Sequence, residues 1–98
     1  MSLKPKQIRY LRGLAHDLKP IIQTGNKGLT DAVMKELAVA LDHHELVKIK
    51  LGSDDRTERK QQIAQIGERS HAELVQSIGK VACFFRRNDE APKLALPK

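Results

Sequence analysis

Apolar residues recur every three or four positions in three segments of the chain, the spacing of a helix with one buried face. The first segment runs from Pro5 to about Asp17, and the second opens after Thr30 and closes near His44. The third follows a polar turn, GSDDRT, at 52–57. Pro5 suits a first helical turn and Thr30 is a good N-cap. The pattern therefore predicts three helices, the third with a thin apolar stripe.

Between these segments the pattern changes to short apolar runs and to strict alternation, which are typical of strands. The segment PIIQT (20–24) predicts a short strand, and ELVKIKL (45–51) predicts a half-buried one. HAELVQSI (71–78) and KVACFFR (80–86) are separated by little more than Gly79, which predicts a tight antiparallel hairpin. Because KVACFFR is apolar on both faces, we expect it to be central in its sheet.

The order helix, strand, helix, strand, helix, strand, strand predicts an α/β sandwich. Right-handed crossovers make the first three strands parallel, and the hairpin reverses the last. A chain of 98 residues is long enough for one hydrophobic core, so we expect a single domain over residues 1–87. Residues 88–98 mix charge, proline and alanine without a period, which predicts a flexible C-terminal tail.

Positive charge is concentrated at the start of the chain. Eighteen Lys and Arg against twelve Asp and Glu give a formal net charge of +6. In the first thirty residues six cations face a single acid, Asp17; the six are Lys4, Lys6, Arg9, Arg12, Lys19 and Lys27. On the first predicted helix Lys6, Arg9 and Arg12 lie nearly opposite the apolar stripe, so they form an exposed basic face. Such a face favours a polyanionic partner.

The strongest local signal is the tetrapeptide GNKG, Gly25-Asn26-Lys27-Gly28, between a predicted strand and a capped helix start. Glycines let a backbone approach a phosphate closely, the first amides of a helix point outward, and Lys27 adds charge. The same logic underlies the GXXG loop of KH domains. The alternative is that Gly28 merely permits a tight strand-to-helix connection.

Other cations are more ambiguous. Lys48 and Lys50 lie on the polar face of the strand at 45–51, and we include them as candidate RNA contacts. Arg56, Arg59 and Lys60 fall in the first turns of the third helix, where cations oppose the helix dipole, so local stability does not explain them. For any one of these residues the alternative is a charge on a solvated face.

The sequence offers no assembled catalytic or metal site. Asp54 and Asp55 are better explained as helix-start residues than as a general acid and base, and no nucleophile or nucleotide-binding fingerprint occurs. The four histidines and Cys83 match no zinc spacing, and Cys83 is expected in the core. We therefore expect no enzyme activity, cofactor, metal or small-molecule substrate. Without an apolar membrane or signal segment, we expect a cytoplasmic protein. We also expect a monomer.

Three motifs in order resemble the CRM-domain family of the bacterial YhbY type: GxxGLT, HELVKIK and ELVQSIGK, within a similarity covering about residues 3–87. The resemblance implies an RNA-binding domain associated with precursors of the large ribosomal subunit; plant relatives act in intron splicing. It also implies a fold like the C-terminal domain of translation initiation factor three, a two-layer sandwich with a mixed four-stranded sheet and the last strand inside. The family's GxxG loop maps onto Gly25, Asn26, Lys27 and Gly28.

Three hypotheses of different classes follow. The first is a ribosome-assembly factor in which the GNKG loop and the basic face of the first helix hold large-subunit ribosomal RNA in pre-ribosomal particles. The second is an adaptor whose basic face meets an acidic protein surface, which would also be salt-sensitive. The third is an enzyme acting on RNA, for which the sequence supplies no acid, base or nucleophile.

Overall fold

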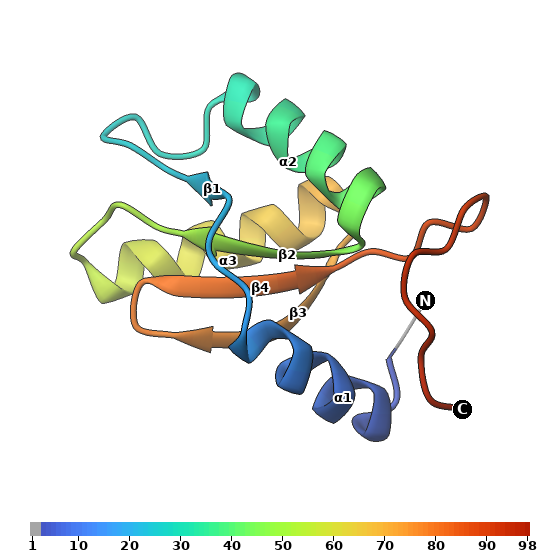
Figure 1. Ribbon diagram of the computed structural model, residues 1–98. Coiled ribbons are helices and arrows are strands. Elements are labelled where there is room, and N and C mark those ends of the chain that lie inside the picture. The colour runs from blue at the N-terminus through green and yellow to red at the C-terminus, as the bar shows by residue number, and fades with distance from the viewer. Residues whose placement is uncertain (1–2) are drawn as a thin grey trace.

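A computed structural model describes residues 3–98 of the chain. Seven elements follow one another in the predicted order (Figure 1). They are α1 (Pro5–His16), β1 (Ile22–Gln23), α2 (Asp31–His44), β2 (Leu46–Lys50), α3 (Arg56–Ser70), β3 (Glu73–Ile78) and β4 (Val81–Phe85). β1 is shorter than the predicted strand PIIQT. Pro20 has no amide hydrogen to donate, while the Ile21 and Thr24 amides on either side of β1 still donate to the Lys48 and Lys50 carbonyls.

The four strands form one mixed sheet in the order β1-β2-β4-β3. β1 runs parallel to β2, and β4 runs antiparallel to both of its neighbours. The first three strands therefore point the same way and the last strand is inside the sheet, as the sequence predicts. Gly79 and Lys80 connect β3 to β4 in the hairpin, and Gly79 adopts a φ of +57°.

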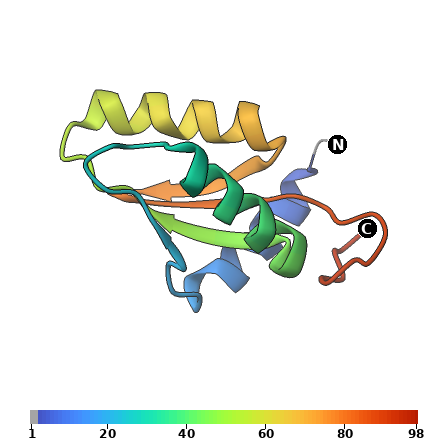
Figure 2. The same ribbon diagram turned by 90° about the horizontal axis from the view of Figure 1, so that it is seen from above.

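Alternating side chains of β4 divide the core into two clusters. Ala82 and Phe84 point toward α2 and α3, whereas Cys83 and Phe85 point toward α1. Figure 2 shows α3 on one side of the sheet and α1 on the other. The sheet with α2 and α3 is the predicted two-layer sandwich, and α1 is the extra helix on the opposite face. Full burial of Phe84 alone contributes roughly 2–3 kcal/mol.

The predicted helix starts are confirmed in atomic detail. Thr30 Oγ1 accepts a hydrogen bond from the Val33 amide at 3.2 Å. The Asp55 carboxylate accepts from the amides of Thr57 and Glu58 at 2.8 and 3.4 Å, so this residue is the N-cap of α3. Its neighbour Asp54 instead forms an ion pair with Lys80 in the hairpin turn. Both carboxylates of this pair are therefore used in structure.

The C-terminal segment 88–98 forms no helix or strand, and it lies folded back on the domain. Its anchor is the carboxylate of Glu45, a fully buried residue with a φ of +61° just after α2. The backbone amides of Asn88, Lys93 and Leu94 donate to this carboxylate at 2.6–2.8 Å. Leu94 and Leu96 pack against the α1 side of the core. The sequence of this segment has no helical or strand periodicity that would predict this packing.

Candidate nucleic-acid interface

The GNKG loop is a tight turn that exposes its backbone. The Gly28 amide donates to the Gly25 carbonyl at 3.0 Å, and Gly28 adopts a φ of +67°, which favours glycine. Gly25, Asn26 and Lys27 are all exposed. An alanine methyl group at Gly25 would meet no atom within 4 Å, so nothing covers the backbone at this corner. The loop leads directly into Thr30 and the first amides of α2.

Two residues that the sequence patterns did not single out support this loop. Gly52, just after β2, lies so close to Thr24 that any side chain there would collide with the Thr24 carbonyl oxygen. Its amide also donates to Thr24 Oγ1 at 2.8 Å. From α3, the buried Gln62 places its amide nitrogen 3.1 Å from the position that a Cβ of Gly28 would occupy. Only the tertiary contacts reveal these supports.

Three connections meet at one edge of the sheet, the edge formed by the carboxyl ends of the parallel strands. They are the GNKG loop, the turn from β2 to α3, and the hairpin turn between β3 and β4, all at the left of Figure 1. The Leu51 amide donates to the Lys80 carbonyl at 2.7 Å, which joins two of them. Lys50 is exposed at the same edge, and its carbonyl accepts from the Thr24 amide at 3.0 Å. Of the predicted site residues, Lys50 therefore has its backbone beside the start of the loop.

The basic face of α1 lies elsewhere on the molecule. Lys4, Lys6 and Arg9 are exposed as predicted, and Arg12 is exposed while its Nε donates to the Val75 carbonyl of β3 at 3.1 Å. α1 begins near the two chain termini, at the end of the molecule away from the GNKG loop (Figure 1). Since α1 also lies on the opposite face of the sheet from α2, the helix face and the loop do not form one patch.

Lys48, predicted as a candidate contact on the polar face of its strand, does not point freely into solvent. Its side chain is half-buried, and its Nζ donates to the carbonyls of Ala15 and Leu18 at 2.9 Å each. These carbonyls lie at the end of α1, where a cation also complements the helix dipole. Lys48 therefore joins α1 to β2, and its ammonium group is already occupied.

Two further cations also have structural partners. Arg86 donates to the carbonyls of Ser70 and Ala38 at 3.0 and 3.1 Å, and it pairs with Asp42 at 2.8 Å. These contacts join the last turns of α2 and α3. Arg87 bonds to both carboxylate oxygens of Glu45 at 3.2 Å. The hydrogen bonds of both arginines therefore hold the end of β4 in place.

Within residues 3–98 no group of three or more His, Cys, Asp or Glu side chains is arranged to hold a metal ion. Burial raises the pKa of the Cys83 thiol, and the nearby Lys48 lowers it only in part. A buried thiol with a raised pKa is a poor nucleophile. None of the helices in this part of the chain is long and apolar enough to cross a membrane.

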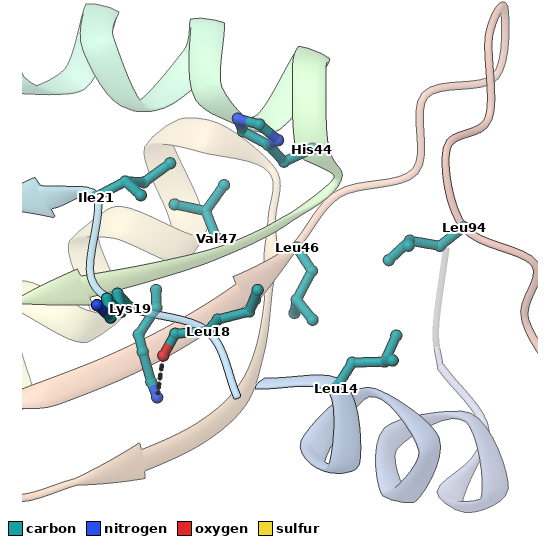
Figure 3. A pocket seen from close by; sticks show the side chains of 9 residues that line it. Leu14, Leu18, Lys19, Ile21, His44, Leu46, Val47 and Leu94 are labelled. Atoms are coloured by element: carbon teal, nitrogen blue, oxygen red, sulfur yellow. Dashed lines mark hydrogen bonds between the residues drawn. The ribbon is translucent and has the colours of Figure 1, made fainter. Parts of the chain in front are cut away.

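An apolar pocket of about 390 Å³ lies between the α1–β1 connection, β2 and the C-terminal segment (Figure 3). Its apolar lining residues are Leu14, Leu18, Ile21, Leu46, Val47 and Leu94, and His44 lies at the end of α2 beside it. The dashed line in Figure 3 is the bond from the Lys48 ammonium to the Leu18 carbonyl. The pocket brings together no acid and base positioned for proton transfer.

The family model described as the CRS1 / YhbY (CRM) domain matches residues 3–86, almost the whole described chain. The chain belongs to the CRM-domain family. The match includes the GNKG loop and every helix and strand, so the resemblance seen in the sequence motifs is confirmed.

Relatives of this CRM domain are found in several bacteria. A Haemophilus influenzae protein named RNA-binding protein is 40% identical over 97 residues, covering 99% of this chain and 97% of its own. The Pseudomonas aeruginosa protein named Probable RNA-binding protein PA4753 is 38% identical, covering 95% and 89%. The solution structure of SAV1595 from Staphylococcus aureus matches with a TM-score of 0.84 and 33% identity, covering 98% of this chain and 100% of its own.

Proposed function

We propose that this CRM domain is an RNA-binding protein, without catalytic activity, that grips phosphate backbone through the GNKG loop. The observation that carries the proposal is the exposed Gly25–Gly28 turn, which combines an uncovered backbone, a helix start and the Lys27 ammonium at one point. The names of the Haemophilus and Pseudomonas relatives support the same ligand.

The loop is the primary contact in this proposal, and Lys50 is a second cation at the same edge. The exposed face of α1, with Lys4, Lys6, Arg9 and Arg12, supplies a separate contact with another part of the RNA. Lys48 is left out because its ammonium group caps α1. With only three aromatic side chains, Tyr10, Phe84 and Phe85, the domain has no stacking platform, and both phenylalanines are buried. Recognition therefore relies on backbone and shape.

The RNA that we propose is large-subunit ribosomal RNA in precursor particles, with the protein acting as a monomer in the cytoplasm during ribosome assembly. This part of the proposal comes from the resemblance to the YhbY type. A particle also supplies the specificity that a protein gripping backbone lacks, because phosphate contacts position a protein without reading sequence.

The test is sucrose-gradient sedimentation of a cell lysate at low and high salt, with wild type beside Lys27→Ala and the charge-matched control Lys98→Ala. We expect wild type and control to comigrate with large-subunit precursors at low salt and to leave them at high salt. Lys27→Ala should stay in the light fractions. With purified RNA, Lys27→Ala should reduce the slope of log K against log salt by about one unit.

If all three proteins stay in the light fractions at low salt, the role in ribosome assembly is wrong. If comigration survives nuclease treatment of the particles, the partner is an acidic protein surface and the adaptor function replaces RNA binding. Turnover of labelled RNA by the pure protein would overturn the absence of catalysis.

A further inference from the structure

A cationic cleft lies on the other side of α3 from the GNKG loop. Its volume is about 440 Å³, and it is lined by Arg56, Arg59, Lys60 and Ile63 of α3 and by Ser77 and Gly79 of the hairpin. Arg56 and Lys60 are exposed, and Arg59 is half-buried. We propose that this cleft is a second phosphate-binding site, which takes a second stretch of RNA backbone; the proposal rests on the proposed RNA-binding function.

Two of the three cations of the cleft, Arg56 and Lys60, are unexplained by the fold. They occupy the first two turns of α3, where positive charge is unfavourable because the helix dipole is positive at that end. Within residues 3–98, the ion pairs include none of the three. Of the nearby acids, Asp55 caps the helix and the Glu58 carboxylate accepts from Ser53 Oγ at 2.9 Å. Asp54 pairs with Lys80, and the charge of Arg59 adds to the lowering of the pKa of Asp54. An external anion would supply the missing counter-charge for Arg56 and Lys60.

The cleft is also partly pre-organised. Arg59 Nη1 donates to the Ser53 carbonyl at 3.0 Å, which fixes the guanidinium at the mouth of the helix start. Guanidinium groups match phosphate oxygens with paired donors, and a fixed one loses little entropy on binding. The exposed Ser77 hydroxyl and the backbone of the Gly79 turn add polar groups on the opposite wall.

Acidic residues separate the cleft from the GNKG loop. The loop side of α3 carries a smaller hollow of about 160 Å³, lined by Gly25, Asn26, Gly52 and Glu58 among others. Asp54 and Asp55 stand in the turn that leads into α3. One strand crossing from the loop to the cleft would pass these carboxylates. Two separate backbone stretches, as in an RNA hairpin or junction, avoid them, so the two sites together select paired and folded RNA.

The test compares two RNA probes of equal length and composition, a stable hairpin and an unpaired strand. The double variant Arg56→Ala, Lys60→Ala spares the structural contact of Arg59, and Lys93→Ala, Lys98→Ala is the charge-matched control at exposed tail positions. We expect the cleft variant to lose roughly tenfold in hairpin affinity and about two units of salt slope. Its affinity for the unpaired strand should match that of the control.

A thermal melt removes misfolding as an explanation. Because Arg56 and Lys60 oppose the helix dipole, the cleft variant should melt at or above the temperature of the wild type. Equal hairpin binding by the cleft variant and the control would overturn the second site. If the cleft variant then also failed to form a nuclease-resistant complex in a cell lysate, the partner of the cleft would be an acidic protein. Failure of wild type to bind either probe would instead overturn the proposed function itself.

Discussion

At the scale of single residues, the two glycines of the GNKG loop are present for different reasons. Gly28 adopts a φ of +67° above Gln62, so the fold itself requires glycine there. Gly25 has no positive φ and has open space where a side chain would stand. The fold therefore does not require glycine at 25, and close approach of a phosphate is the remaining reason for its small size.

This difference can be measured by replacing each glycine with alanine. Gly25→Ala should leave the free energy of unfolding within about 0.5 kcal/mol of wild type, since the methyl group meets nothing. It should weaken RNA binding by roughly three- to tenfold, or about 1 kcal/mol. Gly28→Ala should cost about 1–2 kcal/mol of stability because of its left-handed backbone. Denaturant titration and RNA titration of the two variants would check this, and unchanged RNA affinity in Gly25→Ala would contradict it.

At the scale of elements, α1 is held to the sheet by Lys48, a residue that the sequence pattern places on a binding surface. Lys48 alternates with apolar residues on β2, as an exposed cation would, yet its ammonium group reaches the last carbonyls of α1. Both the helix and the strand must be placed before this contact exists. Lys50, two residues later on the same face, is exposed.

Replacing each lysine with methionine separates the two roles. Lys48→Met should destabilise the domain by about 1–2 kcal/mol, because two carbonyls lose a charged donor, and should leave the salt slope of RNA binding unchanged. Lys50→Met should leave the thermal midpoint unchanged and reduce the slope by about one unit. Thermal melts and binding at several salt concentrations would test both. The reverse pattern would place Lys48 in the RNA interface.

At the scale of the whole molecule, the buried Glu45 ties the C-terminal segment to the junction of α2 and β2. Burial alone would raise the pKa of this carboxyl. The hydrogen bonds from the backbone amides of Asn88, Leu94 and Lys93 and from the Arg87 side chain outweigh that effect and hold its pKa below the ordinary value of 4.5. The ionised form is therefore the one that stabilises the fold, in line with the donors that surround it.

The sign of the pH dependence follows from this lowered pKa. Stability from Glu45 should be fully present above the ordinary pKa of about 4.5 and should be lost as the pH falls through the lower pKa of the folded state. Glu45→Gln should cost about 2–3 kcal/mol at pH 7 and should melt with a shallower dependence on pH below 5. Thermal melts between about pH 7 and 3 would measure both curves. Parallel curves for variant and wild type would show that Glu45 does not carry the effect.

The sequence by itself determined the order of the elements, the helix starts at Thr30 and Asp55, and the central position of β4. These features depend on periodicity and on neighbours a few residues away, such as Thr30 before α2 and the alternation through Phe84 and Phe85. The family motifs also located the GNKG loop. Local patterns suffice here because the spacing of apolar residues within each segment defines the hydrophobic face of that element.

Only the tertiary structure decided which cations remain free. Lys48, Arg86 and Arg87 have nothing in the local sequence that predicts a partner. In the fold their side chains donate to carbonyls and carboxylates of distant segments. The tail of residues 88–98 has no period, yet Glu45 holds it through bonds that span more than forty residues. A pattern along one segment cannot show which donors and acceptors folding brings together from elsewhere. The charge that a surface offers to RNA is what remains after those partners are satisfied.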